Sequence, residues 1–118
     1  MRKFIIVVLL IFSAKQMFAQ KMYSVDYENQ ADISVIVVDY ANQADLKVFK
    51  EDYSNQADGN NGLWFFTDYP NQADNKIFFV KYHNQSDLKI FFVKYRNEAG
   101  WQKNAKKHLL SYFFLLNP

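Results

Sequence analysis

The 118-residue sequence contains no cysteine, only three glycines and only two prolines. The absence of cysteine excludes disulfide bonds, thiolate metal sites and a lipid-bearing cysteine. So little glycine and proline excludes a collagen-like or low-complexity chain. A domain without disulfides must be held by packing and hydrogen bonds. That property suits a bacterial envelope better than a small animal secreted module.

Aromatic residues are abundant instead, at 19% of the sequence, and 50% of all residues are hydrophobic. A chain of this length with so much apolar material predicts one domain with a compact core.

Residues 1–19 have the pattern of a secretory signal peptide. Arg2 and Lys3 supply the positive start, an apolar run over 4–12 follows, and cleavage after Ala19 would leave Gln20 first. The run is too short to span a bilayer as a helix, so no transmembrane segment is expected after signal removal. We therefore expect an exported protein, periplasmic or extracellular, with its domain over 20–118.

Removal of the signal peptide changes the charge balance. The sequence has 14 basic and 12 acidic residues, and Arg2, Lys3 and Lys15 lie within 1–19. The mature chain then has 11 basic and 12 acidic side chains, a net charge of 11 − 12 = −1. No broad basic field remains, so nucleic acid is not an expected partner.

A short phrase, Tyr-x-Asn-Gln-Ala-Asp, occurs four times unchanged and twice with small changes. Successive copies are 13 residues apart, except that the step from Asn55 to Asn71 is 16 residues. A fixed period is the signature of a repeat architecture. The repeated polar turn positions are Asn29, Asp32, Asn42, Asp45, Asn55, Asp58, Asn71, Asp74, Asn84, Asp87 and Asn97.

Each repeat predicts a strand followed by a tight turn. Over 88–95 the β-branched and aromatic residues fall on both alternating faces, and 33–40, 46–53 and 75–82 have the same pattern. Such strands need cover on both sides. The five-residue link predicts a compact turn, in which Asn and Asp bond to nearby backbone of the same turn. The tyrosine before each turn is expected to close the core.

The period stops after Gly100. Trp101, Ala105 and Leu109 are spaced four apart, which predicts a short helix over 101–110 with Lys103, Lys106 and Lys107 on its solvated face. Leu109–Leu116 is again apolar and predicts a last strand or a packed tail.

Three assemblies fit these repeats: a meander, a two-sheet coil, and a closed, intertwined ring. The repeated Asp-Tyr-x-Asn-Gln-Ala-Asp phrase, the long third repeat ending in Trp64–Phe66 and the closing Asn-Glu-Ala-Gly-Trp resemble the septoil knot domain family. The resemblance covers Tyr27 to about His108. It implies an all-β domain of 13-residue strand-turn repeats, intertwined into a seven-crossing backbone knot. Ser86 and Glu98 depart mildly from the pattern, and the apolar extension after His108 departs further.

The repeated side chains offer two binding hypotheses. The aspartates could bind calcium, and the asparagines or tyrosines could bind carbohydrate, although spacing along a rim favours a structural role in the turns. The insertion Gly59–Gly62 is either a tolerated loop extension or a binding lip beside an exposed Trp64.

Few residues suited to catalysis stand outside the repeated pattern. His83 and His108 lack a Ser, Cys or metal-ligand partner at a telling spacing, so no catalytic, cofactor or metal residue is assigned. We expect an exported non-enzymatic structural or interaction module with an unidentified protein or glycan partner. The alternatives are a carbohydrate- or calcium-binding module that uses the turn rim and, more distantly, a hydrolase.

Overall fold

The structure is a computed structural model, and it describes residues 20–110. The predicted signal peptide and most of the predicted segment Leu109–Leu116 lie outside these residues. The strands are β1 (Lys21–Ser24), β2 (Ile33–Val37), β3 (Leu46–Lys50), β4 (Leu63–Phe66), β5 (Asn75–Phe79), β6 (Leu88–Phe92) and β7 (Gly100–Trp101). Short 3₁₀ turns follow them: η2 (Glu28–Gln30), η3 (Ala41–Gln43), η4 (Ser54–Gln56), η5 (Pro70–Gln72), η6 (His83–Gln85), η7 (Arg96–Glu98) and η8 (Asn104–Lys106).

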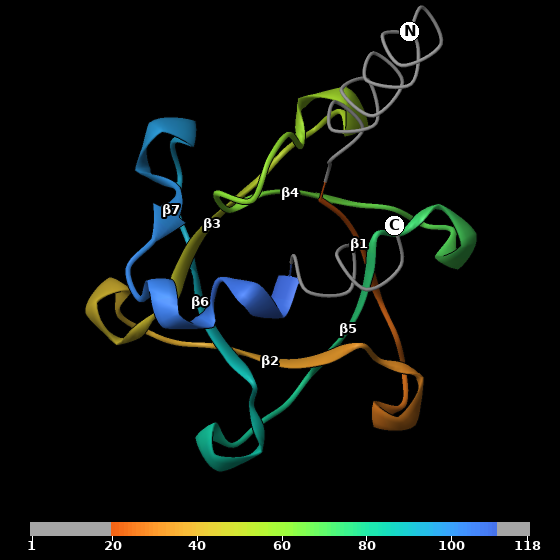
Figure 1. Cartoon of the computed structure of the whole chain (residues 1–118), viewed down its shortest axis with the longest axis horizontal. Coiled ribbons are helices and arrows are strands. Elements are labelled where there is room, and N and C mark those ends of the chain that lie inside the picture. The colour runs from red at the N-terminus through yellow and green to blue at the C-terminus, as the bar shows by residue number, and fades with distance from the viewer. Residues whose placement is uncertain (1–19, 111–118) are drawn as a thin grey trace, which may run out of the picture.

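Six parallel strands close into a ring in the order β4-β1-β5-β2-β6-β3, because β3 also pairs with β4. Figure 1 shows this order clockwise from β4, with the turns η2 to η7 projecting outward. Strands that follow one another in the chain are therefore usually two positions apart in the ring, with one other strand between them. The exception is the connection from β3 to β4, which joins neighbouring places and contains the three additional residues of the long repeat. Strands β1 to β3 make one circuit of the ring, strands β4 to β6 make a second, and the two sets alternate around it.

Each strand of the ring pairs with its two ring neighbours through its two halves. In β2, Ile33–Val35 lies opposite Ile77–Phe79 of β5, and Val35–Val37 lies opposite Leu88–Ile90 of β6. The residue at the overlap is thus held from both sides. This end-to-end overlap explains why the regular strands are only five residues long at most. The sequence predicted eight, and the last three residues instead lead into the turn.

The core is formed by one central residue from each strand of the ring. These central residues recur with the period of the sequence and are all fully buried: Met22, Val35, Val48, Trp64, Ile77 and Ile90. Leu46 and Leu88 are also fully buried beside them. The exposed Trp64 of the binding-lip alternative is therefore not found. Its ring lies in the core and makes an edge-on contact with Phe66, at 6.1 Å between centroids.

The other face of the sheet is only partly covered. Ile36, Val38 and Ala44 form a small second cluster, with the half-buried Val80 and Phe91 packed against it. The all-β, intertwined class is confirmed.

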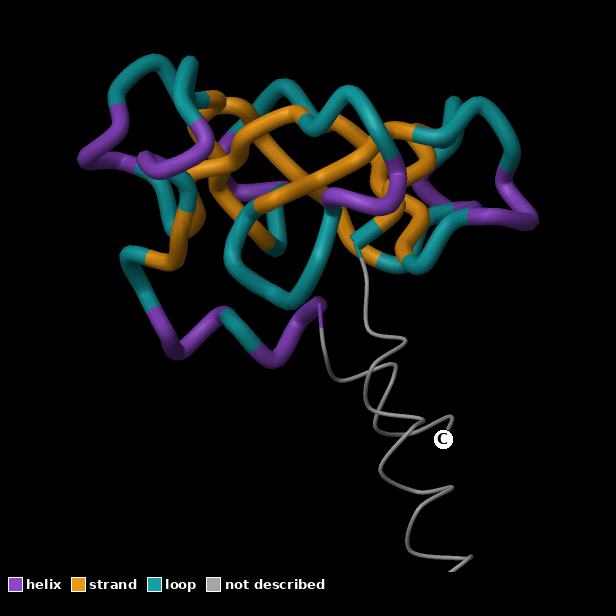
Figure 2. The backbone as a smooth tube through the Cα atoms, turned by 90° about the horizontal axis from the view of Figure 1, so that it is seen from above, coloured by secondary structure: helices purple, strands orange, loops and turns teal. Residues whose placement is uncertain are grey.

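The C-terminal segment, residues 102–110, crosses one face of the ring (Figures 1 and 2). A short helix is present there, but it starts later than predicted, since Trp101 belongs to β7 and pairs antiparallel with Leu46 of β3. Leu110 is buried against the core cluster. Within residues 20–110 there is no helix with the length and apolar content needed to cross a membrane.

Candidate functional site

The six turns η2 to η7 form a rim around the ring, and each is closed by its own backbone. In η3 the N–H of Gln43 donates to the Tyr40 carbonyl at 3.0 Å, and the N–H of Ala44 donates to the Ala41 carbonyl at 3.1 Å. The other turns repeat this pattern. The Asn-Gln-Ala-Asp segments therefore build the compact turns that the sequence predicts.

The aspartate that ends each regular turn bonds to a neighbouring strand, which differs from the predicted bond within its own turn. The N–H of Lys89 donates to Asp45 Oδ2 at 2.9 Å, and the N–H of Asp45 donates to the Lys89 carbonyl at 2.7 Å. We call this two-bond arrangement an aspartate clamp. The four clamps join Asp32 to Lys76, Asp45 to Lys89, Asp74 to Lys21 and Asp87 to Ser34. Each clamp links strands of different circuits.

The third repeat lacks a clamp because of its insertion. Asp58 stands three residues too early, and Asn61 occupies the clamp position, three residues before the central residue Trp64. The backbone that a clamp would bind at this place, Lys47, pairs instead with Gly100 of β7. The strand β7 thus replaces the missing clamp.

Removal of one clamp gives a direct test of its energetic role. Asp45→Ala should lower the free energy of unfolding by about 2–3 kcal/mol, because the Lys89 N–H loses a charged acceptor in a buried place and the half-exposed Lys103 loses its carboxylate partner. Asp58→Ala is the matched control, since Asp58 is exposed, and should stay within about 0.5 kcal/mol. Equilibrium urea denaturation checks both values. Equal losses in the two variants would show that the clamp contributes nothing.

The insertion is a structural junction as well as a loop. Asn60 is buried, and its side-chain oxygen accepts a hydrogen bond from the Gln20 amide at 2.7 Å. The indole N–H of Trp101 donates to the Asn60 carbonyl at 2.8 Å, and the Asn60 amide donates to the Lys107 carbonyl at 3.1 Å. The loop therefore ties Gln20, β7 and the C-terminal segment together.

The rim tyrosines are exposed, so the prediction that they close the core is wrong. Their exposed fractions lie between 60% and 67%. These residues are Tyr27, Tyr40, Tyr53, Tyr69, Tyr82 and Tyr95. Each immediately precedes a 3₁₀ turn, in extended backbone, which directs the chain away from the core.

The rim asparagines are exposed beside these tyrosines. Within residues 20–110, neither their side-chain amides nor the tyrosine hydroxyls form a hydrogen bond. The residues concerned are Asn29, Asn42, Asn55, Asn71, Asn84 and Asn97. The predicted bond from asparagine to its own turn is therefore not formed, and these polar groups face solvent.

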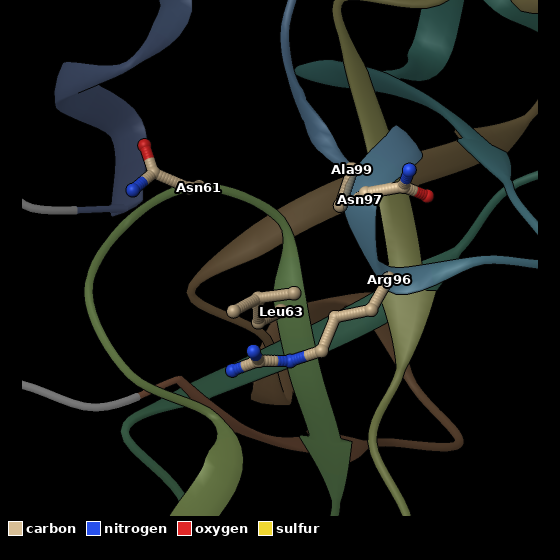
Figure 3. Close-up of a pocket in the computed structure, with 5 residues that line it drawn as sticks. All are labelled: Asn61, Leu63, Arg96, Asn97 and Ala99. Atoms are coloured by element: carbon tan, nitrogen blue, oxygen red, sulfur yellow. The ribbon is translucent and has the colours of Figure 1, made fainter.

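Two hollows lie against the rim. One, of about 460 Å³, lies between the neighbouring turns η2 and η5; its lining is Tyr23, Val25, Asp26, Gln30, Pro70 and Lys76. The other, of about 330 Å³, lies beside the extended third repeat and is shown in Figure 3; its lining is Asn61, Leu63, Arg96, Asn97 and Ala99.

Arg96 makes two polar contacts at the edge of the second hollow. Its Nε lies 3.3 Å from Glu51 Oε2, and its Nη2 donates to the Gln56 carbonyl at 3.3 Å. The Glu51 side chain is 2% exposed, against 55% for Arg96. This pair was not predicted from the sequence. Glu51 could have been noticed in the sequence, because four of the other repeats have a valine at its position.

The remaining candidate residues are dispersed. His83 is exposed on η6, whereas His108 Nδ1 lies 2.9 Å from the Ala105 carbonyl oxygen. Lys103 lies 3.6 Å from the buried Asp45, and Lys106 donates to the Asp87 carbonyl, so these lysines also anchor the C-terminal segment. No group of three His, Cys, Asp or Glu side chains suited to a metal ion occurs between residues 20 and 110.

The interleaved ring defines an intertwined all-β repeat domain. Residues 19–102 match the family described as the 7(1) septoil knot domain, and the chain belongs to this family. Neither a curated protein nor a solved structure matches the chain.

Proposed function

We propose that this protein is an exported, non-enzymatic module that binds an extended neutral glycan through its rim of six turns. The observation that carries the proposal is the set of six exposed tyrosines, each beside an asparagine whose amide has no partner within residues 20–110. A tyrosine ring stacks on the apolar face of a sugar, and an amide both donates to and accepts from sugar hydroxyls. Export is proposed from the signal-peptide pattern of residues 1–19.

Packing does not explain why these tyrosines are repeated. The residue after each tyrosine differs in every copy: Glu28, Ala41, Ser54, Pro70, His83 and Arg96. The copies have therefore diverged where the turn permits it. Tyrosine and asparagine nevertheless occupy their positions in all six copies, although both are exposed. A requirement for binding explains this combination better than a requirement for folding does.

The ring geometry favours a repetitive ligand. The turns project outward around the ring (Figure 1), so one polymer can contact several of them at once. Weak contacts made in succession raise the overall affinity without any single strong site. The hollow between η2 and η5 adds a carboxylate, an amide and an ammonium group beside the rim.

The calcium alternative receives no support from the geometry. A hard cation needs several oxygens that converge on one point. The clamp aspartates are distributed around the ring, and in each of them Oδ2 already accepts a backbone N–H. The histidines are also apart, and the proposal gives them no catalytic role.

The rim is tested by changing three turns together. Tyr27→Ser/Tyr53→Ser/Tyr69→Ser should abolish retardation in gels that contain soluble neutral polysaccharides, such as β-glucan, galactomannan and xylan. Each change should alter the free energy of unfolding by less than about 0.5 kcal/mol, because the rings are mostly in solvent. Glu28→Ala/Ser54→Ala alters two of the same turns and should be retarded like the parent. A parent that none of these polymers retards would refute the proposal.

A further inference from the structure

The chain departs from its own repeat at several positions that meet at one place. Counted from the central residue of each strand, Glu51 occupies the position held elsewhere by Val25, Val38, Thr67, Val80 and Val93. Leu63 occupies the position held elsewhere by Lys21, Ser34, Lys47, Lys76 and Lys89. Asn61 replaces the clamp aspartate, and Arg96 is the one arginine among residues 20–110. Asn61, Leu63 and Arg96 line the same hollow, and Glu51 holds Arg96.

The pair of Glu51 and Arg96 is not explained by stability. A buried charge is costly, and exchange of a buried ion pair for packed apolar residues is often neutral or stabilising. This fold accepts valine at the position of Glu51 in four other repeats. The buried carboxylate does, however, fix the direction of the guanidinium, together with the Gln56 carbonyl. Fixing an arginine at the edge of a hollow is useful when the arginine contacts a ligand.

The chemistry of the hollow indicates what it binds. Figure 3 shows the Arg96 guanidinium beside Leu63, while the exposed side chains of Asn61 and Asn97 lie at opposite ends of the hollow with their amides directed away from Leu63. Leu63 and Ala99 offer an apolar surface, and the two amides offer both donors and acceptors. The positive charge of Arg96 is balanced by Glu51, so the site presents hydrogen-bond donors without net charge. These properties suit a neutral ring with several hydroxyl groups better than an anion.

We propose that this hollow binds one sugar residue of a neutral glycan, with hydroxyls on Asn61, Asn97 and Arg96 and a C–H face on Leu63 and Ala99. The inference rests on the proposed glycan-binding function and adds to it one subsite that is not repeated around the ring. Glu51 is a positioning residue, because it acts through Arg96.

The matched variant for this subsite follows from the repeat. Glu51→Val/Arg96→Ser restores the valine of the other repeats and the residue that stands at the Arg96 position in η4. Hexasaccharides of glucose, mannose and xylose serve as neutral probes in calorimetric titration, and hexagalacturonate serves as the acidic probe. We expect the parent to bind at least one neutral hexasaccharide and the double variant to bind it at least tenfold more weakly. The urea midpoint of the double variant should equal or exceed that of the parent.

Asn97→Ala should weaken binding of the neutral hexasaccharide by about three- to tenfold, since it removes one amide from the hollow. Its control in the preceding turn, His83→Ser, should stay within about twofold of the parent. Glu51→Val alone should weaken binding while the midpoint is kept, which separates positioning of Arg96 from folding.

The outcomes for the subsite and the rim are distinguishable. If neutral polymers retard the parent but no neutral hexasaccharide binds, the subsite is refuted and the rim stands. If a hexasaccharide binds and the double variant loses it, while no polymer retards the parent, the rim is refuted and the subsite stands. Binding of hexagalacturonate alone, or equal hexasaccharide binding by the parent and the double variant, would also overturn the subsite.

Discussion

Gly62→Ala should lower the free energy of unfolding by about 4 kcal/mol or more, a much larger loss than that of Gly59→Ala. Gly62 has φ +86, a conformation that side chains rarely adopt. A Cβ atom there would overlap the Lys47 carbonyl oxygen and would come within 3.2 Å of Leu46 Cδ1 and 3.3 Å of the Gly100 N atom. All three neighbours belong to the junction of β3, β4 and β7. The overlap with backbone can be relieved only by separating these strands, which the ring closure opposes.

Gly59→Ala is the control for this prediction. Gly59 also has a positive φ of +69, but the nearest atom to an added Cβ is Asn61 Nδ2 at 3.7 Å. The cost should therefore be limited to backbone strain, about 1 kcal/mol. Free energies of unfolding from urea titrations, followed by far-UV circular dichroism, compare the two variants. Similar small losses in both would mean that the packing at the β3, β4 and β7 junction is not as tight as the structure has it.

Trp64→Ala should cost about 3–5 kcal/mol, because it opens a cavity at the fully buried central position of β4. The side chain is also the edge-on partner of Phe66, and Phe66 packs against Phe92 at 6.4 Å. Loss of the indole therefore removes support from the aromatic group that joins β4 to β6. The same urea titration measures the loss.

Trp64→Phe should cost much less than Trp64→Ala, about 1–2 kcal/mol. The indole N–H of Trp64 is buried and has no hydrogen-bond partner within residues 20–110, so its removal breaks no bond. The phenyl ring would keep most of the apolar volume. A loss with phenylalanine as large as that with alanine would indicate that the indole N–H does have an unseen role in the core.

The sequence predicts the local units of this fold well and their partners poorly. The 13-residue period, the strand positions and the compact turns can be read from residues that are close in the chain. Which strands pair cannot, because every repeat offers nearly the same edge to every other; only the family resemblance distinguished the interleaved ring from a meander or a coil. For the same reason Asp45 was assigned to its own turn, although it bonds to Lys89.

Two side-chain predictions failed for a related reason. Tyr40 was placed in the core because it ends an apolar run, but the overlapping strands end at Val37 and the tyrosine lies beyond them. The binding-lip alternative placed Trp64 near solvent beside the insertion Gly59–Gly62, but Trp64 occupies the central position of β4 and is fully buried. Of the candidate subsite, Asn97 and, within the insertion Gly59–Gly62, Asn61 were singled out from the sequence, whereas Glu51 and Arg96 were missed. Alignment of the repeats on their central residues would have shown that Glu51 stands out.

The single-place connection from β3 to β4 has a consequence for how this topology arises. Six places visited in steps of two divide into odd and even sets of three, so a chain of uniform repeats would return to its starting place at the fourth strand and find it occupied. The one-position step from β3 to β4 moves every later strand onto the three positions that the first circuit leaves empty. The winding of the whole chain is thus decided by a local difference of three residues, while the remaining repeats stay interchangeable. Excision of residues 59–61 should consequently favour an open spiral of stacked turns over the closed form.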